Sequence, residues 1–186
     1  SWTSTESAVK KILVEGGNPI YMPEGANPEI HKSYPNEKKV YPVSFVGACY
    51  GDRPKIIQEL KRQGIDVHTF GRGWPNGEVP TKEIAKIYSM SMINLGFSGV
   101  GNLDGVHCLK GRDFEVLMSK AFYLTEHSKE LENHFDIGNE LVSWSCVDEL
   151  ITKIKQYLGN PKEIHLVAQN GRNAVFPSCT WENRIR

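Results

Sequence analysis

From Tyr41 onward, the chain alternates short runs of β-branched and aromatic residues with amphipathic stretches of helical length. In the first unit, the buried-strand pattern VSFVG at Val43–Gly47 is followed by a helix pattern that begins near Pro54 and ends at Gly64. Proline suits the first turn of a helix, and glycine suits its end. Strands that alternate with helices of about 10 to 15 residues require crossover connections, which make neighbouring strands parallel. The pattern predicts a parallel sheet flanked by helices.

The same alternation continues to the end of the chain. The further predicted strands are IDVHTFG, SMINLGFS, AFYLTE and NELVSW. The further predicted helices cover residues 81–90, 112–120, 128–135, 146–159 and 161–174. Together these elements predict a Rossmann-like α/β domain.

The first 40 residues do not show this alternation of strands and helices. An amphipathic segment at Ser4–Glu15 is followed by a proline- and glycine-containing stretch with one short predicted strand at Pro19–Met22. We expect residues 1–40 to be an interdomain segment or lead-in, and residues 41–186 to form the domain, including a helical tail. Because the chain begins at Ser1 without a methionine, we expect it to be a piece of a longer protein.

Composition excludes several classes of function. Lys and Arg total 22 and Asp and Glu also total 22, so no overall charge favours nucleic acid or an anionic membrane. No apolar run approaches the roughly 18 residues of a transmembrane segment, and the N-terminus lacks a signal-peptide pattern. The cysteines are scattered, and no metal-binding spacing is present. We expect a cytoplasmic protein with reduced thiols and no metal cofactor.

In an open parallel sheet, ligands bind at the carboxyl ends of the strands. After the first predicted strand, the loop GACYGDRP offers Gly47 for close approach of the backbone and Arg53 for a phosphate at the helix start. A glycine turn with a solvated arginine fits this loop equally well. The later loop FSGVGNLDGVHC is neither a dinucleotide fingerprint nor a P-loop, which excludes a standard kinase or GTPase.

A second anion site is predicted at LKGRDFEV. Gly111 is expected as an N-terminal cap or close-approach residue, so that free N–H groups of the helix face an anion flanked by Lys110 and Arg112. Two cations favour a diphosphate. Glu115, one turn later, would accept hydrogen bonds from ribose or sugar hydroxyls. The alternative is that these side chains, with Asp113, form surface ion pairs worth at most about 1 kcal/mol each.

The order of motifs resembles the C-terminal domain of CgeB-like glycosyltransferases, a group of GT-B-type enzymes. The resemblance covers nearly the whole chain and includes even the early segment GGNPIYMPEGANPE. It rests on VSFVGACYGDRPKIIQEL, FGRGW, INLGFSGVG, LKGRDFEV, LTEHSKELENHF, GNELVSW, VDELITKIKQYLGNP and CTWENRI. It implies two Rossmann-like domains, of which the C-terminal one holds a nucleotide-sugar donor of UDP type.

The resemblance also implies roles for individual residues. Glu115 falls where related enzymes hold the nucleotide ribose, and Arg53 with Lys110 or Arg112 falls where they bind the diphosphate without a metal. Retaining relatives often have a glutamate eight positions before the ribose glutamate, where this chain has His107, so the resemblance does not establish retaining chemistry. His107 is a candidate contact for the donor sugar, with an ordinary loop histidine as the favoured alternative; no other catalytic residue is assigned.

The resemblance implies that an N-terminal acceptor domain of the same protein is missing, so we expect this fragment to be inactive alone. The alternative function is a non-catalytic module that binds a nucleotide or nucleotide sugar. A phosphorylation receiver domain is excluded, because it needs acidic residues after the first strand, where this chain has GACYG.

Overall fold

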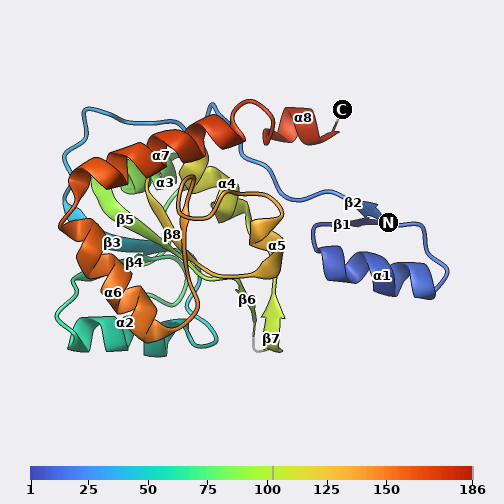
Figure 1. The fold of residues 1–186 in the computed structure, drawn as a ribbon, viewed down its shortest axis with the longest axis horizontal. Coiled ribbons are helices and arrows are strands. Elements are labelled where there is room, and N and C mark those ends of the chain that lie inside the picture. Colours follow the sequence, from blue (N-terminus) through green and yellow to red (C-terminus); the bar gives the residue numbers. More distant parts are fainter. Residues whose placement is uncertain (102, 186) are drawn as a thin grey trace.

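The computed structural model describes residues 1–101 and 103–185. Its centre is a sheet of five parallel strands in the order β4-β3-β5-β8-β9 (Figure 1). The strands are β3 (Tyr41–Val46), β4 (Val67–Phe70), β5 (Ser91–Gly96), β8 (Tyr123–Glu126) and β9 (Val142–Trp144). The predicted parallel sheet is therefore confirmed.

Helices cover both faces of the sheet (Figure 1). The larger ones are α2 (Arg53–Arg62), α3 (Thr81–Met90), α4 (Gly111–Met118), α6 (Val147–Leu158) and α7 (Pro161–Val175). Two short helices, α5 (Lys129–Glu132) and α8 (Trp181–Ile185), follow β8 and α7. Within the described ranges, none of the helices is long and apolar enough to cross a membrane.

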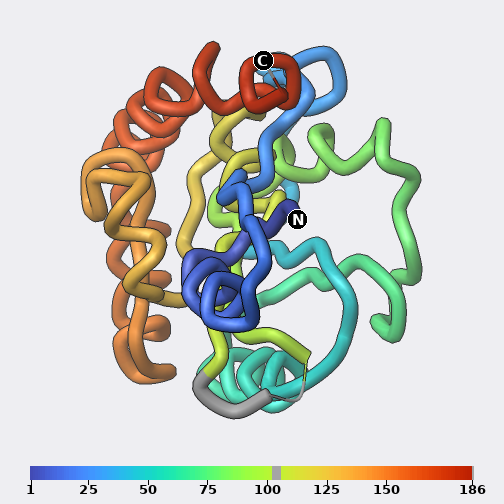
Figure 2. Tube along the Cα trace, turned by 90° about the vertical axis from the view of Figure 1, so that its right-hand side faces the viewer, coloured from blue at the N-terminus to red at the C-terminus, as the bar shows by residue number. Residues whose placement is uncertain are grey.

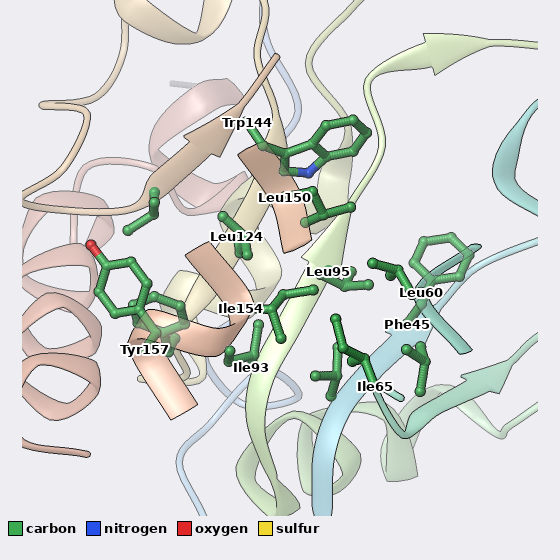
Figure 3. Packing of buried hydrophobic residues seen from close by; sticks show 14 of the residues in the cluster. Phe45, Leu60, Ile65, Ile93, Leu95, Leu124, Trp144, Leu150, Ile154 and Tyr157 are labelled. Atoms are coloured by element: carbon green, nitrogen blue, oxygen red, sulfur yellow. The ribbon is translucent and has the colours of Figure 1, made fainter. Parts of the chain in front are cut away.

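Two apolar clusters hold these layers together because successive strand residues point to opposite faces. Phe45, Leu95 and Leu124 pack on one face with side chains of α2 and α6, as Figure 3 shows. On the other face, Tyr123 packs with Phe114 and with further side chains of α3 and α4. Each helix therefore has a fixed position relative to the strand ends.

The strand order creates a topological switch point. The chain passes from β3 to β4 on one side of the sheet and then crosses to β5 on the other side of β3. The loops that leave β3 and β5 therefore diverge, and such a divergence opens a crevice at the carboxyl edge of the sheet.

The N-terminal segment forms a small unit of its own, with β1 (Trp2–Thr3) paired in parallel with β2 (Ile20–Tyr21) and α1 (Glu6–Val14) between them. Figure 2 shows this blue segment running across the front of the domain. The Glu130 carboxylate on α5 accepts hydrogen bonds from the Glu6 N–H at 2.9 Å and from the Tyr21 hydroxyl at 3.1 Å. These bonds attach the segment to the domain.

The C-terminal tail returns to the same early segment. The Ala26 N–H donates to the Cys179 carbonyl at 3.0 Å, and the Trp181 N–H donates to the Ala26 carbonyl at 3.2 Å. Ala26 is fully buried beneath this pairing. Glu24 lies two residues before Ala26, so this pairing holds Glu24 close to the start of α4.

Candidate functional site

A pocket of about 310 Å³ opens at the carboxyl ends of β3, β5 and β8. One wall is the antiparallel hairpin of β6 (Gly99–Val100) and β7 (Leu103–His107), in the loop that the sequence indicated only as glycine-rich. The lining includes Tyr50, Arg53, Ile56, Phe97, His107 and Glu126. The pocket therefore lies at the topological switch point, where ligands of such folds bind.

Arg53 is the buried cation of this pocket, with 5% of its surface exposed. Its Nη1 donates to the Ala48 carbonyl at 2.9 Å, and its guanidinium lies 3.8 Å from the centre of the Tyr50 ring. Burial, and then the charge of Arg112, lower its pKa. Among the residues whose side chains the structure describes, 1–101 and 106–185, no carboxylate lies within 4.0 Å of it. The solvated alternative is wrong because Arg53 is buried, and within these ranges its charge lacks an ionic partner.

Arg112 reaches back from α4 to the end of β3. Its Nε donates to the Val46 carbonyl at 2.6 Å, and its Nη1 is buried without a hydrogen-bond partner. Its guanidinium fills the space beside Gly47, so that an added Cβ there would collide with Nη2 and come within 2.9 Å of the Phe45 ring. The absence of a side chain at Gly47 admits Arg112. Arg53 and Arg112 lie 5.4 and 4.8 Å from the centre of the Phe45 ring.

The first turn of α4 is fixed by Asp113. One oxygen of this carboxylate accepts the Lys110 N–H at 2.7 Å, and the other accepts the Tyr123 hydroxyl at 2.6 Å. Lys110, not Gly111, is the N-terminal cap, and the helix begins at Gly111 rather than at Arg112. Asp113 is 3% exposed, which rules out a surface ion pair. Burial raises its pKa to about 6, although both hydrogen bonds favour the charged form.

Two carboxylates meet beside Gly111. Glu24 accepts the Gly111 N–H, and an added Cβ on Gly111 would lie 2.6 Å from Glu24 Oε2 and 3.2 Å from Glu115 Oε1. Burial raises the pKa of both carboxyl groups, and the charge of Glu115 adds to the rise at Glu24. His31 Nε2 lies 3.7 Å from Glu115 Oε1. Glu24 accepts from Gly111 and Glu115 from Tyr88, and a hydroxyl-rich ligand would donate to the remaining lone pairs of these adjacent carboxylates.

His107 lies at the end of β7, lines the pocket and is linked to Glu126 through a serine. Its Nδ1 lies 2.7 Å from Ser98 Oγ, and Ser98 Oγ donates to Glu126 Oε2 at 3.1 Å. The same carboxylate oxygen accepts the N–H groups of Ser98 and Gly99 at 2.9 and 3.1 Å. Glu126 therefore shapes the loop after β5, and His107 is part of a hydrogen-bonded chain.

The structure arranges six of the seven predicted residues in three groups, and the seventh, Lys110, caps α4 with its Nζ 3.0 Å from Cys108 Sγ. Arg53 and His107 line the pocket, whereas Gly47 and Arg112 lie beside it around Phe45. Gly111 and Glu115 lie with Glu24, a residue in a segment that carries no recognisable motif. In the described part of the chain, no group of three His, Cys, Asp or Glu side chains is placed to hold a metal ion.

The solved structures that resemble this chain have the same fold at low sequence identity. Sucrose-phosphate synthase from Thermosynechococcus elongatus is 13% identical with a TM-score of 0.75, and the match covers 96% of this chain and 53% of that one. TarM from S. aureus, in a complex that contains UDP, is 12% identical with a TM-score of 0.75, and the match covers 99% and 42%. HepE from Anabaena in complex with UDP is 9% identical with a TM-score of 0.70, and the match covers 98% and 60%.

The chain spans about half the length of these solved relatives. Its fold is that of the C-terminal Rossmann-like domains of GT-B glycosyltransferases. The comparison with curated proteins finds no match. A family model described as glycosyl transferase-like matches residues 53–186, which include α2, most of the pocket lining and all of α4. This chain therefore belongs to the glycosyl transferase-like family.

Proposed function

We propose that this chain is the donor-binding domain of a CgeB-like glycosyltransferase and binds a nucleoside diphosphate sugar, with UDP as the nucleotide. The observation that carries the proposal is the pair of arginines, Arg53 and Arg112, beside Phe45 at the carboxyl ends of the strands. Buried charges in proteins are normally paired. Among the residues whose side chains the structure describes, neither guanidinium has a carboxylate within 4.0 Å. The charges of Asp113 and Glu115 still act on Arg112, so a diphosphate would above all be the partner that Arg53 lacks.

In this proposal, the diphosphate extends from Arg53 in the pocket toward the first turn of α4. The positive end of the α4 dipole and the Arg112 guanidinium add positive potential, whereas the Gly111 N–H is already donated to Glu24. Negative charge on the diphosphate grows as the bond to the sugar breaks, and fixed cations stabilise that charge more in the transition state than in the ground state. The proposal assigns this charge neutralisation to the protein and requires no metal cofactor.

Glu115 is proposed to hold the ribose. Its side chain is 29% exposed and contacts Tyr88 and His31 rather than a lysine or arginine at salt-bridge distance. A carboxylate in this position has free lone pairs for the two hydroxyls of a ribose. The pyrimidine base of UDP is suggested by the UDP complexes of TarM and HepE, two proteins with this fold.

The acceptor site is proposed to lie on a second, N-terminal domain of the same cytoplasmic protein. The isolated chain is then expected to bind the donor without transferring its sugar. The proposal is therefore tested by measuring donor binding to this chain rather than sugar transfer.

The test is isothermal titration calorimetry with UDP, GDP, ADP and CMP. We expect UDP to bind, and Arg53→Lys to weaken binding by about tenfold, because lysine cannot form the paired hydrogen bonds of a guanidinium with phosphate. Arg62→Lys, at the exposed end of the same helix, is the matched control and should leave binding unchanged.

A second comparison tests the ribose contact. Glu115→Gln should weaken binding of UDP but change binding of 2′-deoxy-UDP much less, because the deoxy ligand lacks one of the hydroxyls that Glu115 would accept from. The proposal fails if no diphosphate binds to the folded chain, or if Arg53→Lys binds UDP as tightly as the wild type.

A further inference from the structure

The hydrogen-bonded chain from Glu126 through Ser98 to His107 has a defined direction. A carboxylate can only accept hydrogen bonds, so the Ser98 hydroxyl proton points to Glu126 Oε2 at 3.1 Å. The Ser98 oxygen is then left to accept at its other side. Its neighbour there, at 2.7 Å, is His107 Nδ1, which must therefore carry a proton.

This direction fixes the chemistry of the remaining ring nitrogen. A neutral imidazole has one N–H group, so a proton on Nδ1 leaves Nε2 as a hydrogen-bond acceptor. The supporting groups are well anchored, since Ser98 is 5% exposed and Glu126 Oε2 also accepts two main-chain N–H groups. The His107 ring itself is exposed. The ring is therefore held from behind and is open to a ligand in front.

The ring also lies at a boundary. His107 lines the pocket that contains Arg53 and, on its other side, a wider hollow of about 590 Å³ between α1 and α5. A group that leaves the Arg53 pocket toward this hollow would pass the imidazole. In a nucleotide sugar, the group attached to the terminal phosphate is the sugar.

We propose that Ser98 and Glu126 are positioning residues that hold His107 in the Nδ1–H form, so that its Nε2 accepts a hydrogen bond from a hydroxyl of the donor sugar. The inference rests on the proposed function, which places the diphosphate against Arg53 in the same pocket. It adds the contact that distinguishes a nucleotide sugar from a nucleotide.

The ring state is tested by ¹⁵N NMR of the histidine side chains, with His107→Ala used to identify the His107 signals. We expect a protonated Nδ1 and an unprotonated Nε2 at neutral pH in the wild type. Ser98→Ala removes the acceptor at Nδ1 and should shift the ring toward the Nε2–H form. An Nε2–H ring in the wild type, or a Ser98→Ala spectrum unchanged from it, would overturn the positioning role.

The sugar contact is tested by calorimetry with UDP, UDP-glucose, UDP-galactose and UDP-N-acetylglucosamine. For the UDP-sugar that binds most tightly, His107→Ala and Glu126→Gln should each weaken binding about threefold to tenfold, the usual range for one hydrogen bond. Binding of UDP itself should weaken less than binding of this UDP-sugar in both variants. His165→Ala is the matched control, because His165 is exposed on α7.

The outcomes separate the two proposals. If UDP and UDP-sugars bind and His107→Ala affects both equally or neither, the sugar contact is wrong while the proposed function stands. If no nucleotide binds to the folded chain, the proposed function fails and the sugar contact fails with it. The NMR result then still decides whether Ser98 and Glu126 set the ring state.

Discussion

Asp113 gives the most quantitative prediction, because burial disfavours the charged form of its carboxyl group. Its pKa rises from an ordinary value of 3.8 to about 6, chiefly through burial. The folded protein therefore holds a proton that the unfolded chain loses between these values, and stability falls as pH rises through this window. Since each tenfold change in proton affinity is worth about 1.4 kcal/mol, the ionised carboxylate costs about 3 kcal/mol at neutral pH.

The substitution Asp113→Asn removes this cost. An amide can direct its oxygen to the Lys110 N–H and its NH₂ group to the Tyr123 oxygen, as a protonated carboxyl group would. Tyr123 also retains Thr125 as a hydrogen-bond partner. We expect the variant to match the wild type in unfolding free energy near pH 4 and to exceed it by about 3 kcal/mol at pH 7.

The assay is urea unfolding of both proteins from pH 4 to pH 7.5. Glu24 and Glu115 also have raised pKa values, but both proteins carry them, so the difference between the two curves isolates Asp113. A difference that does not change with pH, or that grows as pH falls, would refute the raised pKa. A variant that is less stable at pH 7 would show that the charged hydrogen bonds outweigh burial.

Two further predictions concern glutamate and glycine positions. Glu24→Gln keeps an acceptor for the Gly111 N–H but removes a negative charge from the start of α4. Calorimetry should therefore show that UDP binds about threefold to tenfold more tightly to this variant. Unchanged or weaker binding would show that the Glu24 charge does not oppose the diphosphate. Gly96→Ala places a Cβ against the side chains of Thr125 and Tyr123 and should lower the unfolding free energy by about 1 to 3 kcal/mol. The control for Gly96→Ala is Gly159→Ala, whose new Cβ has its nearest neighbour at 3.4 Å; an equal loss in both would contradict the packing argument.

Local patterns were sufficient to predict most of the fold. The helix predicted at residues 81–90 has these bounds in the structure, and each predicted strand of the sheet is present. Apolar spacing and terminal residues are encoded within each element, so they can be read directly. The β6–β7 hairpin and the pairing of β1 with β2 were missed. Strands β1, β2 and β6 have two residues each, which is too short to show a period, and β7 lies in a glycine-rich loop. The pairing of β1 with β2 joins segments on either side of α1, so no local pattern encodes it.

The candidate site was less predictable, because its contacts join distant parts of the chain. The sequence left open whether Arg53 is solvated, and only the packing of Tyr50 and Phe97 around it shows that it is buried. Glu24 lies in a segment without regular pattern, and its approach to Gly111 depends on the pairing of Ala26 with the tail. Glu126 ends a predicted strand, and no local pattern indicates that its carboxylate holds the loop after β5.

A crystal structure of this chain with UDP would reveal where the nucleotide binds. We expect diphosphate oxygens against the guanidinium of Arg53 and the start of α4, with the ribose hydroxyls on Glu115. A UDP molecule bound away from Arg53, or one whose diphosphate faces solvent, would contradict this expectation.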